Sequence, residues 1–299
     1  MIRIGIDFGG TKIEAAALDQ DGHILSRIRR PNPGAYDTAL AAIRDLVGAV
    51  EGECGLATSV GVGLPGSISP KSGLVRNANS LYLNGRSFQR DLEKVLGRPV
   101  RLANDANCLT LSEAADGAGD GHSVVFAAIL GSGCGAGLVV DKRLIEGANG
   151  VAGEWGHMPL PWPDGDELPA PPCWCGKTGC MELYVSGAGL AADHQSRGGG
   201  AASAEAVVAA ARAGEPSASR ALQIYLDRLA RGLAVIVNVL DPGVIVLGGG
   251  MSNVDELYAR LPAAIGRWVF SDVFETPIVR ARHGDSSGVR GAAWLWPGP

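Results

Sequence analysis

The densest group of reactive side chains lies between residues 157 and 180. Cys173, Cys175 and Cys180 are clustered, with glycines in the turns between them, and His157 precedes them. Three thiolates and an imidazole form the ligand set of a tetrahedral Cys₃His zinc site, and four protein ligands leave no open position for catalysis. A disulfide is the alternative, which a reducing cytosol and the odd number of cysteines in the cluster disfavour. We therefore predict a structural zinc ion.

A carboxylate followed by glycines and a hydroxyl lies near the start of the chain. Asp7 ends an alternating apolar segment, and Gly9, Gly10, Thr11 and Lys12 follow it. Glycines let the backbone approach a phosphate closely, threonine can donate a hydrogen bond, and a carboxylate can hold a water bound to Mg²⁺. A plain hairpin turn with a solvated aspartate is the other interpretation of this segment.

The same pattern of strand, glycine loop and strand recurs further along the chain. An apolar run at 124–130 leads into Gly131, Ser132 and Gly133, and a second strand is predicted at 138–140. A repeat of this kind is a stronger signal than either loop alone, because one glycine loop is often only a tight turn. Two such loops facing each other could hold a phosphate chain from both sides with backbone N–H groups.

Polar residues also follow a buried strand at 100–103. Asn104 and Asp105 stand where this strand meets a helix N-terminus, and Asn107 follows them. Asn and Asp routinely cap helices. Polar groups at the carboxyl end of a strand also suit a general base with flanking hydrogen-bond donors. The spacing of these residues alone favours the helix cap over the general base.

Two standard nucleotide motifs are excluded. The segment 176–178 ends like a P-loop, but Pro171 stands where that pattern requires glycine. The segment 61–66 formally fits the dinucleotide fingerprint, yet it does not open a helix and no acidic residue is placed for a ribose.

Strands alternating with helices predict a layered α/β fold, and 299 residues suggest about two domains. We expect one lobe at 1–118, completed by 286–299, and a second at 119–285 that carries the zinc-binding loop 153–182. The proline-rich segment 158–172 is expected to lie on the surface without regular structure.

Composition narrows the class of protein. The net charge is −5 and no long basic run occurs, so nucleic acid is not expected as a partner. The apolar runs are too short to span a membrane and the first strand leaves no room for a signal peptide, so a cytoplasmic protein is expected. Glycine is in excess, with 44 residues, which we interpret as loops that approach phosphates and turns around the metal.

Taken in order, six motifs resemble those of the ROK family (repressors, open reading frames and kinases), within the actin-like sugar-kinase superfamily. They are DFGGTK at 7–12, NDAN at 104–107, GSGCGAG at 131–137, GEWGH at 153–157, CWCGKTGCME at 173–182 and LGGGMS at 247–252. The resemblance implies a duplicated actin-like, ribonuclease H-like ATPase fold with an interlobe cleft. It also implies an ATP- and Mg²⁺-dependent hexose kinase in which His157 both binds zinc and contacts the sugar.

The family's functional residues carry over position by position. Asp105 would be the base that accepts the proton of the sugar hydroxyl. The residues expected on the sugar are Gly66, Asn77, Asn79, Asn104, Asp105, Glu154, His157 and Glu182. Those expected on ATP are Asp7, Gly9, Gly10, Thr11, Lys12, Gly131, Ser132, Gly133, Gly248, Gly249 and Gly250.

Within the family, the stretches at 63–80, 153–162 and 282–296 most resemble bacterial fructokinases of the manno(fructo)kinase type. This implies transfer to the 6-hydroxyl of fructose. N-acetylglucosamine, mannose and glucose kinases share the same skeleton and remain alternatives. A sugar-responsive repressor is a further alternative, but such proteins carry an N-terminal helix-turn-helix extension. A homodimer is expected at the level of the family.

Overall fold

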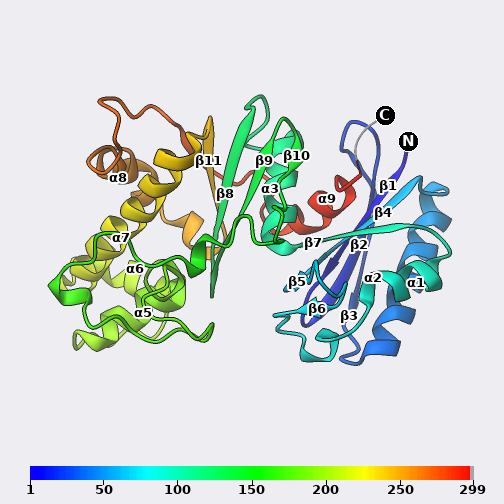
Figure 1. Ribbon diagram of the computed structural model, residues 1–299, viewed down its shortest axis with the longest axis horizontal. Helices are drawn as coiled ribbons and strands as arrows, with labels where there is room; N and C mark the ends of the chain where they lie inside the picture. The colour runs from blue at the N-terminus through cyan, green and yellow to red at the C-terminus, as the bar shows by residue number, and fades with distance from the viewer. Residues whose placement is uncertain (297–299) are drawn as a thin grey trace. The chain divides into compact units, whose positions relative to one another are not determined.

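The computed structural model describes residues 1–296, except for the Asp285 side chain, and the chain forms two compact units (Figure 1). The first unit comprises 1–121, 137–152 and the segment from 282 onward, and the second comprises 122–136 and 153–281. The division into lobes at 1–118 and 119–285 stays a prediction, and the compact units differ from it in grouping 137–152 with the first. Of the segment expected to complete the first lobe, residues 297–299 lie outside the described residues.

The sheet of the first unit joins a meander to parallel strands. Its elements are β1 (Arg3–Phe8), β2 (Lys12–Leu18), β3 (Ile24–Pro31), α1 (Tyr36–Cys54), β4 (Ser59–Leu64), α2 (Phe88–Leu96) and β7 (Val100–Asn104). The strand order is β3-β2-β1-β4-β7, with β1, β2 and β3 antiparallel and with β4 and β7 parallel to β1. Parallel neighbours need a crossover, which α1 and α2 supply.

Alternation along the strands assigns the two faces of this sheet. Ile4 and Ile6 of β1 belong to the core that α1 and α2 cover, whereas Ala16 and Leu18 of β2 pack on α9 (Ser287–Ala293). Figure 1 shows α1 and α2 on one side of the sheet and α9, in red, on the other. Successive side chains of a strand point to opposite faces, so the period of two in the sequence produces both layers.

Glycines allow α9 to lie directly on the strands. Gly5 and Gly61 are paired in register on β1 and β4, and a Cβ atom at either would lie 1.8 or 1.9 Å from a carbonyl oxygen of α9. Gly291 of α9 would likewise meet the carbonyl of Cys108 at 1.7 Å. Part of the glycine excess therefore serves helix packing, and our interpretation of it as phosphate loops and metal turns alone is wrong. Gly61 and Gly63 lie inside β4, which supports the exclusion of a dinucleotide fingerprint.

The second sheet repeats the topology of the first. Its strands are β8 (Val124–Leu130), β9 (Cys134–Val140), β10 (Arg143–Leu144), β11 (Val244–Gly248) and β12 (Ile278–Arg280). The order is β10-β9-β8-β11-β12, with β9 and β10 antiparallel and with β8, β11 and β12 parallel. Strand β9 begins in the second unit and ends in the first. A meander followed by parallel strands thus occurs twice, and the expected duplicated α/β fold is confirmed.

Helices of the second unit cover its sheet through one large core. They are α4 (Glu182–Val185), α5 (Gly187–Ser196), α6 (Ala204–Arg212), α7 (Pro216–Leu240) and α8 (Asp255–Gly266). Helix α7 begins with proline at its first position after Glu215, whose carboxylate accepts hydrogen bonds from two backbone N–H groups. Its apolar side chains pack against Phe126, Ile245 and Leu247 of the sheet. In the described part of the chain, no helix combines the length and apolarity that a membrane crossing requires.

We predict that Gly61→Ala lowers the free energy of unfolding by about 3 kcal/mol, because the added methyl group must displace the backbone of α9. Gly48→Ala is the matched control, since Gly48 lies in α1 with open space around it and alanine favours a helix by about 0.5–1 kcal/mol. Urea unfolding of the two variants measures both effects. Equal stability of the two would contradict the packing argument.

Candidate functional site

A pocket of about 380 Å³ lies within the second unit, at the glycine loop between β8 and β9. Gly131 and Ser132 from this loop and Gly250 after β11 line it, together with small residues at the starts of α5 and α6. These residues come from four separate segments of the chain. The structure therefore brings together three of the residues expected on ATP. The sequence analysis missed Gly187, Ser203 and Glu205, which also line the pocket.

Close backbone contacts build the wall of this pocket. Gly249 has a φ of +79°, and a Cβ atom there would lie 2.6 Å from the carbonyl oxygen of Leu130. The N–H of Gly187 donates to the carbonyl oxygen of Gly131 at 2.7 Å. Gly248 is buried inside β11 and is not among the lining residues. Glycine is required at 249 for both its conformation and its contact.

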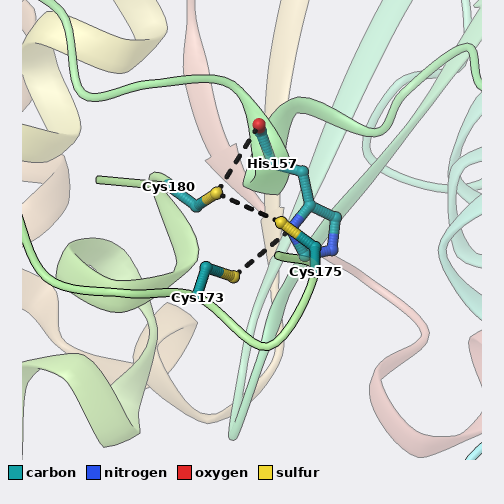
Figure 2. Close-up of side chains that lie close together, drawn as sticks. All are labelled: His157, Cys173, Cys175 and Cys180. Carbon is teal, nitrogen blue, oxygen red and sulfur yellow. Dashed lines mark hydrogen bonds between the residues drawn. The ribbon is translucent and has the colours of Figure 1, made fainter. Parts of the chain in front are cut away.

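The predicted metal ligands converge in the second unit (Figure 2). One ligand atom from each of His157, Cys173, Cys175 and Cys180 lies within 4.8 Å of all the others. The Sγ atoms of Cys175 and Cys180 are 3.6 Å apart, and Sγ of Cys173 is 3.8 Å from Nδ1 of His157. All three cysteines are free, so the disulfide alternative is not realised here. We call residues 157–180 around these four side chains the knuckle.

The donor set and its spacing fit a tetrahedral ion. Zn–S bonds of about 2.3 Å separate two sulfur ligands by roughly 3.8 Å, close to the distances observed. Burial and the neighbouring thiols raise the pKa of Cys180 to about 12, because several thiolates repel one another unless a cation lies among them. These four residues could therefore hold a zinc ion.

Glu182 joins the knuckle to the glycine loop. Its Oε1 accepts a hydrogen bond from Nε1 of Trp174 at 2.7 Å, and its Oε2 accepts one from the N–H of Cys134 at 3.0 Å. A Cβ atom at Gly133 would lie 2.8 Å from this carboxylate, so a larger residue there would require Glu182 to shift. The residue expected on the sugar is thus also bonded to the loop expected on ATP. Trp174 was missed by the sequence analysis.

The segment around Glu154 is fixed by its neighbours. Trp155 is buried, donates from Nε1 to the carbonyl of Gly135 at 3.0 Å, and packs edge-on against Phe126. A Cβ atom at Gly156 would lie 2.0 Å from the carbonyl oxygen of Cys134. The side chain of Glu154 is exposed beside this anchored turn.

In the first unit, Asp105 is the first residue of α3 (Asp105–Asp116), directly after β7. Asn104 caps this helix, its Oδ1 accepting the N–H of Asn107 at 2.7 Å, so the cap interpretation holds for Asn104. The carboxylate of Asp105 stays in contact with solvent and accepts the N–H of Ala106 at 2.8 Å. Desolvation by the surrounding protein raises its pKa, against the effect of the backbone hydrogen bonds. Raised carboxyl pKa values are typical of general bases.

Asp7 lies close enough to Asp105 for the two carboxylates to interact. Burial, followed by the charges of Glu14 and Asp105, raises the pKa of Asp7 to about 6. The Asp7 carboxylate lies against Gly288 of α9, where a Cβ atom would approach it to 3.1 Å. A divalent cation would relieve the repulsion between such carboxylates. Asp7 and Asp105 thus lie in the same unit, close enough for the charge of Asp105 to raise the pKa of Asp7.

Hydrogen bonds fix the conformation of the hairpin loop after Asp7. Gly9 donates its N–H to the carbonyl of Lys12 at 2.9 Å, and its own carbonyl accepts Nδ2 of Asn32 at 2.7 Å. Tyr82 in turn donates to Oδ1 of Asn32 at 2.8 Å. Gly10 and Thr11 remain exposed at the tip. Asn32 and Tyr82 support this loop from a distance in sequence that no local pattern reveals.

Gly66 lies beside Asn77 and Asn79 in the first unit. It precedes a short ribbon of β5 (Ser67–Ile68) and β6 (Val75–Arg76), and its φ is +86°. A Cβ atom on Gly66 would lie 2.7 Å from the N atom of Ala78. Asn84 fixes this segment by bonding both the N–H and the carbonyl of Ala78 at 2.9 Å. Both asparagines are exposed.

Comparison with known proteins assigns the chain to a family. The model of the ROK family matches residues 3–298. The chain belongs to the ROK family. It is 40% identical to an N-acetyl-D-glucosamine kinase from Pectobacterium atrosepticum, covering 97% of each chain. It is similar in structure to a ROK hexokinase from Thermus thermophilus, with a TM-score of 0.88, 32% identity and coverage of 99% of this chain and 97% of that one. A ROK glucokinase from Streptomyces griseus, in complex with glucose and AMPPNP, gives a TM-score of 0.77 at 29% identity and covers 99% of both chains.

The resemblance to ROK-family sugar kinases drawn from the six motifs is thereby confirmed. The finer resemblance to fructokinases is not supported by these relatives.

The proline-rich loop of this ROK protein is anchored by a buried ion cluster that the sequence analysis missed. Glu167 accepts hydrogen bonds from Arg228 at 2.7 Å and from Arg231 at 2.5 and 2.9 Å, and all three side chains are at most 3% exposed. Arg231 also donates to the carbonyls of Pro161 and Trp162. The loop was expected to lie on the surface without regular structure, but a turn at Gly165–Glu167 places this carboxylate against α7.

We predict that Glu167→Gln lowers the free energy of unfolding by about 3–5 kcal/mol, because it leaves two buried guanidinium groups under-compensated. Burial raises the pKa of Glu167, but the hydrogen bonds from Arg231 and Arg228 outweigh it and hold the pKa at about 2. The stabilisation is complete above the ordinary pKa of 4.5 and is lost as the pH falls toward 2. Unfolding of the variant should lack this part of the acid dependence.

Glu256→Gln is the matched control for this prediction. Two hydrogen bonds from Arg212, at 2.7 Å each, likewise hold the pKa of Glu256 at about 2, but both side chains are partly exposed. Exposed pairs contribute less than about 1 kcal/mol. Denaturant unfolding at pH 7 and pH 3 compares the two variants, and an equal loss of stability in both would contradict the role of burial.

Proposed function

We propose that this ROK protein is an ATP-dependent sugar kinase that phosphorylates a hexose, with N-acetylglucosamine as its preferred substrate. We infer the kinase activity chiefly from Asp105, a carboxylate of raised pKa that lies at the start of α3 and interacts with Asp7. The choice of sugar is supported by the relative that is 40% identical over nearly the whole chain, whose name is N-acetyl-D-glucosamine kinase. Fructose, our expectation from the motifs, has no such support.

The second unit would bind the nucleotide. Backbone N–H groups of Ser132 and Gly133 would contact phosphate oxygens, Gly131 would let the backbone approach them closely, and the pocket beside them, lined by Gly250 and Ser203, would take the adenosine. Gly249 would act through its backbone conformation, which holds the loop after β11 against the end of β8. A pocket of this size, lined mainly by small residues with both polar and apolar surface, suits a nucleoside.

Residues of the first unit would supply the reactive groups. Asp105 accepts the proton of the attacking sugar hydroxyl, and Asp7 holds a water of the Mg²⁺ ion that accompanies ATP. Gly9, Gly10, Thr11 and Lys12 would contact the phosphate chain. Phosphoryl transfer needs placement and neutralisation of charge more than covalent chemistry, so a sparse set of groups is sufficient.

Sugar recognition would use groups that bond hydroxyls. A hexose offers many hydroxyls, and a site that bonds each of them discriminates strongly against a sugar that lacks one. The side chains proposed for this role are Asn77, Asn79, Asn104, Glu154, His157 and Glu182, with Gly66 giving room for the backbone.

We predict that the protein phosphorylates N-acetylglucosamine with a kcat/KM at least tenfold above that for fructose, mannose, glucose or N-acetylgalactosamine. Asp105→Asn should lower kcat by about 10³-fold, because the base is lost while the amide keeps the shape. ADP release across the five sugars measures both effects. Asp37→Asn, in the exposed first turn of α1, is the matched control and should match the unaltered protein. Turnover on every sugar no higher than that of Asp105→Asn would refute the kinase, and a preference for fructose would refute the choice of sugar.

We also propose that the knuckle binds one structural zinc ion per chain through His157, Cys173, Cys175 and Cys180. The ion would hold the loop in place and take no part in the transfer, because four protein ligands fill its coordination. Metal analysis should find about one zinc per chain, and Cys175→Ser should lower this content and the melting temperature. Cys54 is a free cysteine at the end of α1, and Cys54→Ser is the matched control. It should leave the zinc content unchanged and shift the melting temperature by no more than a few degrees. Full zinc in Cys175→Ser would contradict the assignment.

A further inference from the structure

Trp174 is an exposed aromatic residue in the middle of the knuckle. Its side chain is 67% exposed, so its position depends on a few specific contacts. It stands between Cys173 and Cys175, so a metal bound by those thiolates fixes the backbone on both sides of it. Its ring meets that of His157 edge-on, with centroids 4.9 Å apart. Three of the four candidate ligands thus determine where the indole points.

The polar end of the indole is directed at Glu182. The N–H of Trp174 donates to Oε1 of Glu182 at 2.7 Å, while Oε2 of the same carboxylate accepts the N–H of Cys134 at 3.0 Å. Both partners are donors, so the two oxygens of an ionised carboxylate are matched to them and an amide would not be. Hydrogen bonds to a charged group are about twice as strong as neutral ones.

The carboxylate in turn limits the glycine loop. Glu182 lies against Gly133, where a Cβ atom would come within 2.8 Å of Oε2. The N–H of Gly131 bonds the carbonyl of Gly133 at 3.0 Å, so a contact at Gly133 bears directly on the position of Gly131. Gly131 and Ser132 line the nucleotide pocket. A continuous series of contacts within the second unit therefore runs from the knuckle through the indole and the carboxylate to this pocket.

We propose that Trp174 is a positioning residue, which holds Glu182 against the glycine loop so that the knuckle sets the geometry of the nucleotide site. This inference rests on the proposed function, since it assigns the pocket to a nucleotide. It gives the metal a role in ATP binding, in addition to holding the proline-rich loop, and it gives Glu182 a second role beside contact with the sugar.

Trp174→Phe tests the proposal, because it keeps an aromatic ring beside His157 while it removes the N–H donor together with part of the ring system. The affinity for MgADP, measured by calorimetry without sugar, should fall about tenfold. Zinc content and melting temperature should stay close to those of the unaltered protein. Trp162→Phe is the matched control, since this half-exposed tryptophan of the same loop stacks on Trp268 and does not contact Glu182. Its MgADP affinity should be unchanged.

A double-mutant cycle identifies the path of the effect. Glu182→Gln should also weaken MgADP binding, and adding Trp174→Phe to it should cost little more, because both changes break one series of contacts. Independent, additive losses would overturn the proposal. So would MgADP affinity within twofold of the unaltered protein in Trp174→Phe, or a loss confined to sugar affinity, which would mean that the indole contacts the sugar itself. If the unaltered protein binds no MgADP and phosphorylates no sugar, the proposed function fails as well.

Discussion

Contact between backbones at glycines is the constraint on which both units depend. In the first unit, Gly5 and Gly61 let α9 lie on β1 and β4 at distances where any methyl group would collide with a carbonyl oxygen. In the second unit, Gly156 meets the carbonyl of Cys134 and Gly249 meets that of Leu130 in the same way. The first pair sets the packing of a layer, whereas the second pair sets the walls of the candidate site. Glycine costs conformational entropy in a strand or helix. Its use here therefore marks positions where a short distance between two backbones matters more than the propensity to form a strand or helix.

The charged groups of the second unit divide into those that hold the fold and those that remain free for chemistry. Glu167 uses both oxygens on arginines and is almost fully buried, so its carboxylate is a fixed anchor for the proline-rich loop. Glu154 is exposed on an anchored turn and keeps its acceptor capacity for a ligand. Glu182 lies between these cases: two protein donors orient it, yet a carboxylate has about four acceptor positions, so it can accept further hydrogen bonds.

Much of the fold could be predicted because it is local. The meanders follow from alternation and glycine turns, and the recurrence near 131 indicated the duplication that the two sheets display. The convergence of the four candidate metal ligands could be predicted because their spacing and chemistry are specific. Contacts between segments distant in sequence left no such signal: the pairing of Glu167 with Arg231 spans 64 residues. The same holds for Asn32 and Tyr82 behind the first glycine loop. The expected preference for fructose found no support among the relatives, since sugar preference depends on few side chains and motif resemblance alone does not identify them.

The duplication also explains why two similar glycine loops differ in what they can bind. Each joins the first two strands of a meander, β1 to β2 and β8 to β9. After β9 the chain continues into α5 and α6, whose first residues, Gly187 and Ser203 among them, close a pocket beside Gly131. The loop after Asp7 is instead braced by Asn32 from the end of its own meander, which leaves Gly10 and Thr11 exposed. The loop between β8 and β9 is therefore enclosed by helix starts, whereas the loop after Asp7 is open and lies beside two carboxylates, so the ligands that fit them differ. The two similar turns have different surroundings because different segments of the chain pack around each of them.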